Sequence, residues 1–184
     1  RQRDDDGRQS QLADEETVRL MAEKNTWWSL QPLTYDADVF ARMTPVSQKK
    51  ALQVFAGTEN AYRLAKQHNI KTAWGSDILF DATAAARQNS YVAMMSRWYT
   101  PAEALRMATA SNGELLALSG FINPYPGKLG VVEEGALADL LVVDGDPLAD
   151  IKLIEDPAKN FVVIMKDGEM FKNTLSPNAE LARR

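Results

Sequence analysis

The sequence predicts an α/β fold, because helix and strand patterns alternate along its first two-thirds and strands dominate the remainder. Between about residues 13 and 120 this alternation is typical of parallel strands joined by crossover helices. Turns and short strands follow, so we expect one domain over 1–122 and another over 123–184. Only two strands precede that boundary, and two parallel strands cannot form a covered sheet alone. The first region therefore needs further strands beside it.

The first elements follow a polar, charged stretch over residues 1–10, which predicts a solvated tail. A helix is expected over 13–24, because acidic residues favour its N-terminal end and Val18, Met21 and Ala22 form an apolar face. The stretch TWWSLQP, residues 26–32, predicts a short buried strand. Residues 33–46 predict a long loop, which is either functional or mobile.

A long helix is expected next, with Ser47 as its N-cap and His68 near its end. The stretch IKTAWGS, residues 70–76, predicts the second strand. A third helix is expected to begin near Asp81 and to continue through Trp98.

A fourth helix is expected at TPAE, with Thr100 as N-cap and Glu103 completing a capping box. A break is expected at SNG, residues 111–113, before a helical stretch that ends at Gly120. In the last third, strands are predicted at ADLLVVD, NFVVIMK and EMFK. Asp167 and Gly168 separate the last two and indicate a two-residue hairpin turn.

The composition excludes several classes of partner and site. Hydrophobic residues make up 45% and charged residues 25%, the formal net charge is −4, and no basic run occurs, which disfavours nucleic acid and anionic membranes as partners. No apolar run is long enough to span a bilayer. Cysteine is absent, which excludes disulfides and thiolate metal sites. The chain begins at Arg1 without methionine, so we expect a processed chain or a fragment; its localisation is unknown from these features.

The candidate site residue is Asp77, which follows the second predicted strand. In parallel α/β folds the carboxyl ends of the strands carry ligands and catalysis. An aspartate there can accept a proton, ligate a metal or cap a turn. His68 lies at the other end of the same strand, roughly 20 Å away, and is therefore a poor partner. Trp27, Trp28 and Trp74 form either a stacking platform or, as we favour, part of the core.

Four stretches resemble the C-terminal part of the metal-dependent amidohydrolase superfamily, in its imidazolonepropionase-like and prolidase-like branch. They are AWGSD, TPAEALRMATASNGELLAL, GKLGVVEEGALADLLVVDGDPLADI and VVIMKDGEMF, and the resemblance covers about residues 12–172. It implies a (β/α)8 TIM-type barrel, with TWWSLQP as strand 7 and IKTAWGS as strand 8. It also implies that residues 138–172 belong to a small β-sandwich built from both chain termini.

The resemblance further implies hydrolysis of amide or related C–N bonds at a divalent metal, with zinc expected. In that family an aspartate after strand 8 ligates the metal and moves the proton, and Asp77 matches this position. The family's other ligands are mainly histidines after earlier strands, and this chain contains none that match. Asp77 therefore resembles the last ligand of a site whose other ligands lie outside this chain.

Two hypotheses follow for function. The first is a C-terminal fragment of a metal-dependent amidohydrolase that acts on a small-molecule or dipeptide-like substrate. The alternative is a non-catalytic binding or scaffold protein that retains part of the fold. By itself the chain is expected to be inactive and to hold no tight catalytic metal. It is also expected to associate with itself or with a missing N-terminal barrel portion, because its strand edges would be unpaired.

Overall fold

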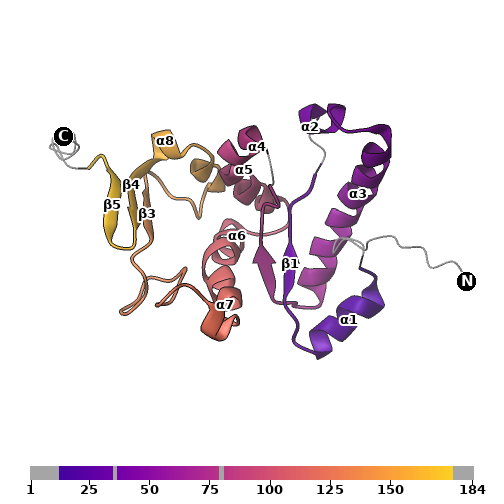
Figure 1. Cartoon of the computed structure of the whole chain (residues 1–184), viewed down its shortest axis with the longest axis horizontal. Coiled ribbons are helices and arrows are strands. Elements are labelled where there is room, and N and C mark those ends of the chain that lie inside the picture. Colours follow the sequence, from indigo (N-terminus) through magenta and orange to yellow (C-terminus); the bar gives the residue numbers. More distant parts are fainter. Residues whose placement is uncertain (1–12, 35–36, 79–80, 176–184) are drawn as a thin grey trace, which may run out of the picture. The chain divides into compact units, whose positions relative to one another are not determined.

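A computed structural model describes residues 13–34, 37–78 and 81–175 (Figure 1). The chain divides into two compact units between Asp77 and Ile78. These units reflect packing within this chain, so the domain boundary expected near residue 122 stays a prediction. The tail predicted over residues 1–10 lies outside the described residues.

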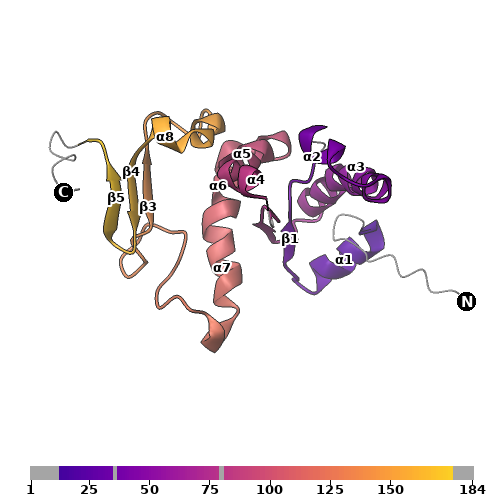
Figure 2. The same ribbon diagram turned by 45° about the horizontal axis from the view of Figure 1, so that its top comes forward.

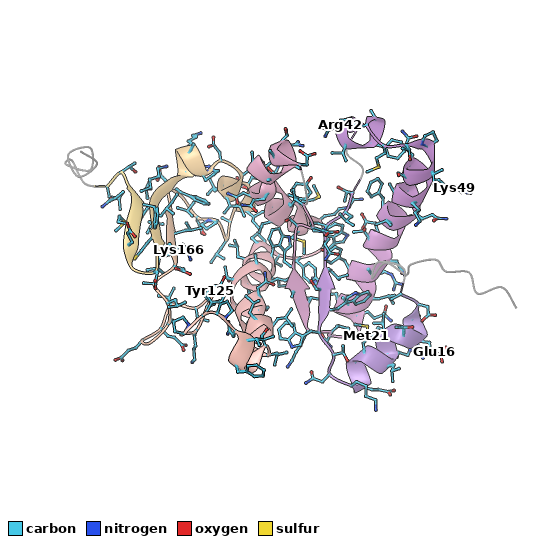
Figure 3. The ribbon with its side chains drawn as sticks, in the orientation of Figure 1. Glu16, Met21, Arg42, Lys49, Tyr125 and Lys166 are labelled. Carbon is cyan, nitrogen blue, oxygen red and sulfur yellow. The ribbon has the colours of Figure 1, made fainter. Side chains whose placement is uncertain are left out.

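The first helix, α1 (Glu15–Glu23), begins at a side-chain cap. Asp14 is the N-cap, and its carboxylate accepts a hydrogen bond from Thr17 N at 2.8 Å. Val18 is buried and Met21 is half-buried, whereas Ala22 is exposed, so the predicted apolar face is narrower than expected. Figure 3 labels Glu16 and Met21 on this helix.

The segment after the first strand contains a helix where a loop was predicted. Residues Ala37–Ala41 form α2, within the range 33–46. The side-chain amide of Gln48 donates a hydrogen bond to Phe40 O at 3.0 Å, which ties α2 to the helix that follows. This tertiary contact stabilises a five-residue helix that would be marginal in isolation, which is why the local sequence did not predict it.

The long helix, α3 (Pro45–Gln67), begins earlier than predicted. Thr44 is its N-cap, and Thr44 Oγ1 accepts a hydrogen bond from Ser47 N at 3.2 Å. The prediction of Ser47 as the cap was therefore wrong. Pro45 explains the difference, because proline is favoured at the first helical position, where its missing N–H costs nothing. The helix ends at His68, its C-cap, as predicted.

Two parallel strands form the sheet of the first unit, as the alternation of elements predicted. β1 (Trp28–Leu30) pairs with β2 (Thr72–Trp74) in a register that places Leu30 opposite Trp74. In Figures 1 and 2, α1 and α3 lie on the same side of this pair. The buried apolar residues of this unit include Val18, Trp28, Leu30, Val54, Ala61, Tyr62, Leu64, Ala65, Ile70 and Ala73.

In the second unit, the helix predicted from Asp81 to Trp98 consists of three short pieces. They are α4 (Ala82–Ala86), α5 (Gln88–Ala93) and a 3-10 helix over Met94–Arg97. Asp81 is the N-cap of α4, as predicted, and accepts a hydrogen bond from Ala84 N at 2.9 Å. Arg87, with φ −107° and ψ 14°, leaves helical geometry and separates α4 from α5.

The next helix continues through the predicted break at residues 111–113. It comprises α6 (Pro101–Arg106), a π-helical turn over Met107–Ser111 and α7 (Asn112–Ala117). Its start confirms the predicted capping box of Thr100 and Glu103. Gly113 does not break the helix, because the helix packs against a later loop: a Cβ atom there would lie 2.4 Å from Leu129 O. The glycine therefore permits close packing.

The last third contains an antiparallel sheet of three strands in the order β3-β4-β5. They are β3 (Leu140–Val143), β4 (Phe161–Lys166) and β5 (Glu169–Asn173), and each overlaps a predicted strand. Between β3 and β4 the chain forms a 3-10 helix over Ile151–Glu155 and the short α8 (Pro157–Asn160).

The turn between β4 and β5 confirms the predicted hairpin. Asp167 has a φ of 51° and Gly168 a φ of 78°, as a type I′ turn requires. Asp139 holds this turn: its Oδ1 accepts a hydrogen bond from Asp167 N at 2.6 Å, and its Oδ2 lies 3.9 Å from Lys166 Nζ. Lys166 is labelled in Figure 3. Among the described residues, no helix has the length and apolar character needed to cross a bilayer.

Candidate functional site

Asp77 lies where the sequence predicted, just beyond the carboxyl end of β2. It is exposed, and its φ of 52° places it in the left-handed region. Few residues other than glycine adopt this conformation, although aspartate does so more readily than most. Because β1 runs parallel to β2, the residues that follow both strands meet at one edge of the pair. That edge is where parallel α/β sheets bind ligands.

Gln31 shares this edge with Asp77, and the sequence interpretation did not single it out. It follows β1 directly and is half-buried. Its side-chain nitrogen lies 3.8 Å from the position that a Cβ atom on Gly75 would occupy. Gly75 N also donates a hydrogen bond to Leu30 O, on the last residue of β1, at 3.2 Å, which extends the parallel ladder one residue past β2. Gln31 could have been identified from the sequence, because it is a polar residue between a predicted buried strand and Pro32.

His68 is not brought to this edge. It caps α3 at the start of β2, so the strand separates it from Asp77. Its Nε2 atom is buried and lies 3.8 Å from Glu15 Oε1, beyond hydrogen-bond range. The role predicted from the sequence, a polar residue at a helix C-terminus, is confirmed. The sequence did not predict its proximity to α1.

The tryptophans of the two strands differ in their surroundings. Trp28 is buried, as the core interpretation predicted, whereas Trp27 and Trp74 are half-buried. Lys71 Nζ lies 5.6 Å from the centroid of the Trp27 ring, within cation–π range. Trp28 is therefore a core residue, and Trp27 packs beneath a lysine.

The described residues do not form a metal site by themselves. Among them, no group of three or more histidine, cysteine, aspartate or glutamate side chains could hold a metal ion. A catalytic zinc site usually has three protein ligands and a water molecule. Asp77 can contribute one oxygen ligand, and the sequence contains a single histidine, His68, and no cysteine. Any metal held by Asp77 would need further ligands.

Comparison with known proteins gives consistent similarities. The profile of the Amidohydrolase family matches residues 5–171. An ochratoxinase from Aspergillus niger is 28% identical over 175 residues, which are 93% of this chain and 35% of that protein. The crystal structure of an amidohydrolase matches with a TM-score of 0.76 and 30% identity, over 90% of this chain and 39% of that chain. A prolidase complexed with N-methylphosphonate-L-proline matches with a TM-score of 0.74 and 28% identity, over 89% and 39%.

These relatives are much longer than this chain, which spans 35% to 39% of their length. The family match over residues 5–171 includes β1, β2, Asp77, β3, β4 and the first part of β5. The resemblance to the amidohydrolase superfamily inferred from the four sequence stretches is confirmed, and its prolidase-like part is supported by a solved structure, whereas its imidazolonepropionase-like part stays a prediction. Because the family profile matches most of its residues, this chain belongs to the amidohydrolase family.

Proposed function

We propose that this chain is the C-terminal part of a metal-dependent amidohydrolase that hydrolyses amide, peptide-like or cyclic amide C–N bonds. The observation that carries the proposal is Asp77 at the carboxyl edge of a parallel strand pair, in a chain that matches the family over residues 5–171. The named relatives support hydrolysis, since they include an ochratoxinase and a prolidase.

In the complete protein, β1 and β2 are strands 7 and 8 of a (β/α)8 barrel, and β3, β4 and β5 belong to a β-sandwich. The parallel pairing of β1 with β2 supports this arrangement. The need for neighbours supports it too, because a two-stranded parallel sheet is not stable without further strands. The missing N-terminal barrel portion is the partner we propose for these open edges.

Asp77 contributes one carboxylate to the proposed site. It supplies an oxygen ligand to a divalent metal, with zinc as the expected ion, and accepts a proton during hydrolysis. A bound metal of this kind supplies Lewis-acid activation of the scissile carbonyl and of a water molecule. We propose that the remaining ligands lie in the missing N-terminal portion of the complete protein, and the lack of a ligand cluster among the described residues supports this. Exposure of Asp77 in this chain agrees with a carboxylate that faces a site completed by other residues.

The substrate we propose is a small amide or dipeptide-like molecule. The prolidase among the structural relatives was solved with a phosphonate analogue that contains L-proline. In this chain, the described residues 31–34 and α2 follow the carboxyl end of β1, and Gln31 lies on the same edge as Asp77. We propose that this segment helps to determine which substrate is accepted.

The test uses a reading frame that extends this chain to the length of its relatives. We expect the longer protein to hydrolyse Xaa-Pro dipeptides or N-acyl amino acids in the presence of zinc. Asp77→Asn should lower kcat by about two to four orders of magnitude, because the amide cannot accept the proton.

Asp167→Asn is the matched control, since Asp167 is also exposed and has a φ of 51°. Its kcat should stay within about twofold of the parent, because a surface change away from the site is usually neutral. Equal activity in the two variants would contradict the role of Asp77. Absence of amide hydrolysis in a folded longer protein that binds zinc would contradict the proposed function.

A further inference from the structure

The side chains of β1 alternate between the two faces of the strand pair. Trp28 and Leu30 are buried, whereas Ser29 between them is exposed. Successive side chains of a strand point to opposite faces, and α1 and α3 lie on the same side of the pair (Figure 2). The buried residues therefore face these helices, and Ser29 faces the other way. Gln31, two residues after Ser29, continues this second face at the carboxyl end of the strand.

The backbone on both sides of Gln31 is held by hydrogen bonds. Leu30 O accepts a hydrogen bond from Gly75 N at 3.2 Å, and Gln31 O accepts one from Leu33 N at 2.8 Å. Pro32, between the two residues of that second bond, is buried. The backbone of Gln31 is therefore ordered, so the direction in which its side chain leaves the strand is fixed.

The side chain of Gln31 lies over Gly75, the residue that follows β2. The register of the two strands pairs Leu30 with Trp74, so it places Gln31 opposite Gly75. A Cβ atom on Gly75 would lie 3.8 Å from Gln31 Nε2. Because Gly75 has no side chain, the carboxamide of Gln31 extends across the carboxyl ends of both strands. Asp77 follows Gly75 by two residues at this edge.

The group that Gln31 presents is neutral and can both donate and accept hydrogen bonds. Its carboxamide donates through Nε2 and accepts through Oε1, so it matches the C=O and N–H groups of an amide. The described residues that directly follow the two strands, 31–34 and 75–77, include the acidic Asp77 and no lysine or arginine. A substrate carboxylate would therefore meet no cation from these segments, whereas a neutral amide would meet a matching partner.

We propose that Gln31 is a specificity-determining residue whose carboxamide binds a neutral amide group beside the scissile bond of the substrate. This inference rests on the proposed hydrolysis, because it assigns Gln31 to the same site as Asp77. In a (β/α)8 barrel the helices form the outer ring, so the face that carries Ser29 and Gln31 is the interior. Substrates bind at the carboxyl end of that interior. The preferred substrate is then a peptide-like molecule with an additional amide, such as an acylated or amidated dipeptide.

The test uses the longer protein, extended to the length of its relatives and loaded with zinc. An Xaa-Pro dipeptide is compared with the same dipeptide carrying an N-acetyl group and with the same dipeptide ending in a carboxamide. We expect one of the two added amides to raise kcat/KM by about tenfold, through the hydrogen bonds that it makes with Gln31. The gain should lie mainly in KM, because the added group does not react.

Acetylation and amidation also remove a charge from the dipeptide, so the decisive quantity is how far the gain depends on Gln31. Gln31→Met keeps the length of the side chain but loses the carboxamide, so it should remove the gain. Gly75→Val should reduce the gain as well, because its side chain fills the space over which the carboxamide lies. Gln53→Met is the matched control: Gln53 is exposed on α3, and its change should leave both the gain and the hydrolysis of the dipeptide unaltered.

Calorimetric titration of the three compounds into the Asp77→Asn form of the longer protein makes the same comparison without turnover. Tighter binding of an amide-extended compound that Gln31→Met abolishes would support the inference, even where no hydrolysis is measured. Equal binding of all three compounds would overturn it, as would a gain that Gln31→Met leaves unchanged. Either result can occur while the dipeptide is still hydrolysed, whereas loss of hydrolysis alone counts against the proposed function.

Discussion

Asp77 and Asp167 both have a positive φ, but for different structural reasons. Asp167, with a φ of 51°, sits at the tip of a type I′ turn, and Asp139 accepts its backbone N–H. That turn requires a positive φ, so local structure explains the residue. Asp77, with a φ of 52°, follows a parallel strand and has no hairpin to explain its geometry. Sparsely populated conformations recur at functional sites, which agrees with the role proposed for Asp77.

At the residue scale, Gly130 packs closely against the backbone of Thr109, and substitution of this glycine tests that contact. Gly130 has a φ of 72°, and a Cβ atom there would lie 2.3 Å from the carbonyl of Thr109. Gly168 has a similar φ of 78° but open space around it. We expect Gly168→Ala to cost about 1–2 kcal/mol from backbone strain alone, and Gly130→Ala about 4 kcal/mol or more.

Urea unfolding gives the two free energies, and hydrogen exchange over residues 105–117 locates the effect. Faster exchange in the π-helical turn should accompany Gly130→Ala only. Equal costs for the two substitutions would mean that the loop does not pack against Thr109 as closely as the structure describes.

At the scale of elements, the N-cap of α3 is Thr44, whereas the sequence predicted Ser47, and substitution of each residue tests which one caps the helix. Thr44 Oγ1 accepts the hydrogen bond from Ser47 N, so Thr44→Ala should destabilise the chain by about 1 kcal/mol. Ser47→Ala keeps that backbone donor and its acceptor and loses only the exposed hydrogen bond that Thr44 Oγ1 donates to Ser47 Oγ at 3.0 Å, so its effect should stay within about 0.5 kcal/mol. Thermal unfolding of both variants measures the difference. A larger loss of stability for Ser47→Ala than for Thr44→Ala would mean that Ser47, as the sequence predicted, caps the helix.

The elements that the sequence predicted correctly are those with local causes. The hairpin at Asp167 follows from the conformational freedom of its two central residues, and the capping box at Thr100 follows from two side chains three positions apart. The elements it missed depend on contacts with residues outside their own segments. α2 is held by Gln48, and the π-helical turn packs against Gly130. Such contacts are not encoded in a short window of sequence.

The candidate site shows the same limit. Asp77 could be placed at a strand end because hydrophobic periodicity defines β2. The position of Gln31 on the same edge, beside Gly75, could not be predicted, since it depends on the register of two strands separated by the whole of α3. Further ligands for the proposed metal could not be identified from this sequence, which contains one histidine and no cysteine.

The whole molecule combines the amidohydrolase family fold with two small sheets. The first unit has only two paired strands among its described residues, and the second has three. Three strands with a covering element can be stable alone, whereas two parallel strands need neighbours. We therefore attribute the stability of the first unit mainly to the packing of α1 and α3 on β1 and β2. Among the described residues at their carboxyl edge, Asp77 is the candidate metal ligand.

The last prediction concerns metal binding by the 184-residue chain alone, for which Asp77 is the candidate ligand among the described residues. One carboxylate leaves a bound metal mostly hydrated, and three protein ligands are usual in a catalytic zinc site. We expect the purified chain, after dialysis against zinc and then buffer, to retain well below one equivalent of metal. It should hydrolyse no Xaa-Pro dipeptide above background. Metal analysis, with Asp77→Asn as the comparison, should give the same low zinc content for both proteins. Stoichiometric zinc that Asp77→Asn removes, together with hydrolysis by a chain of verified mass, would mean that this chain supplies ligands beyond Asp77.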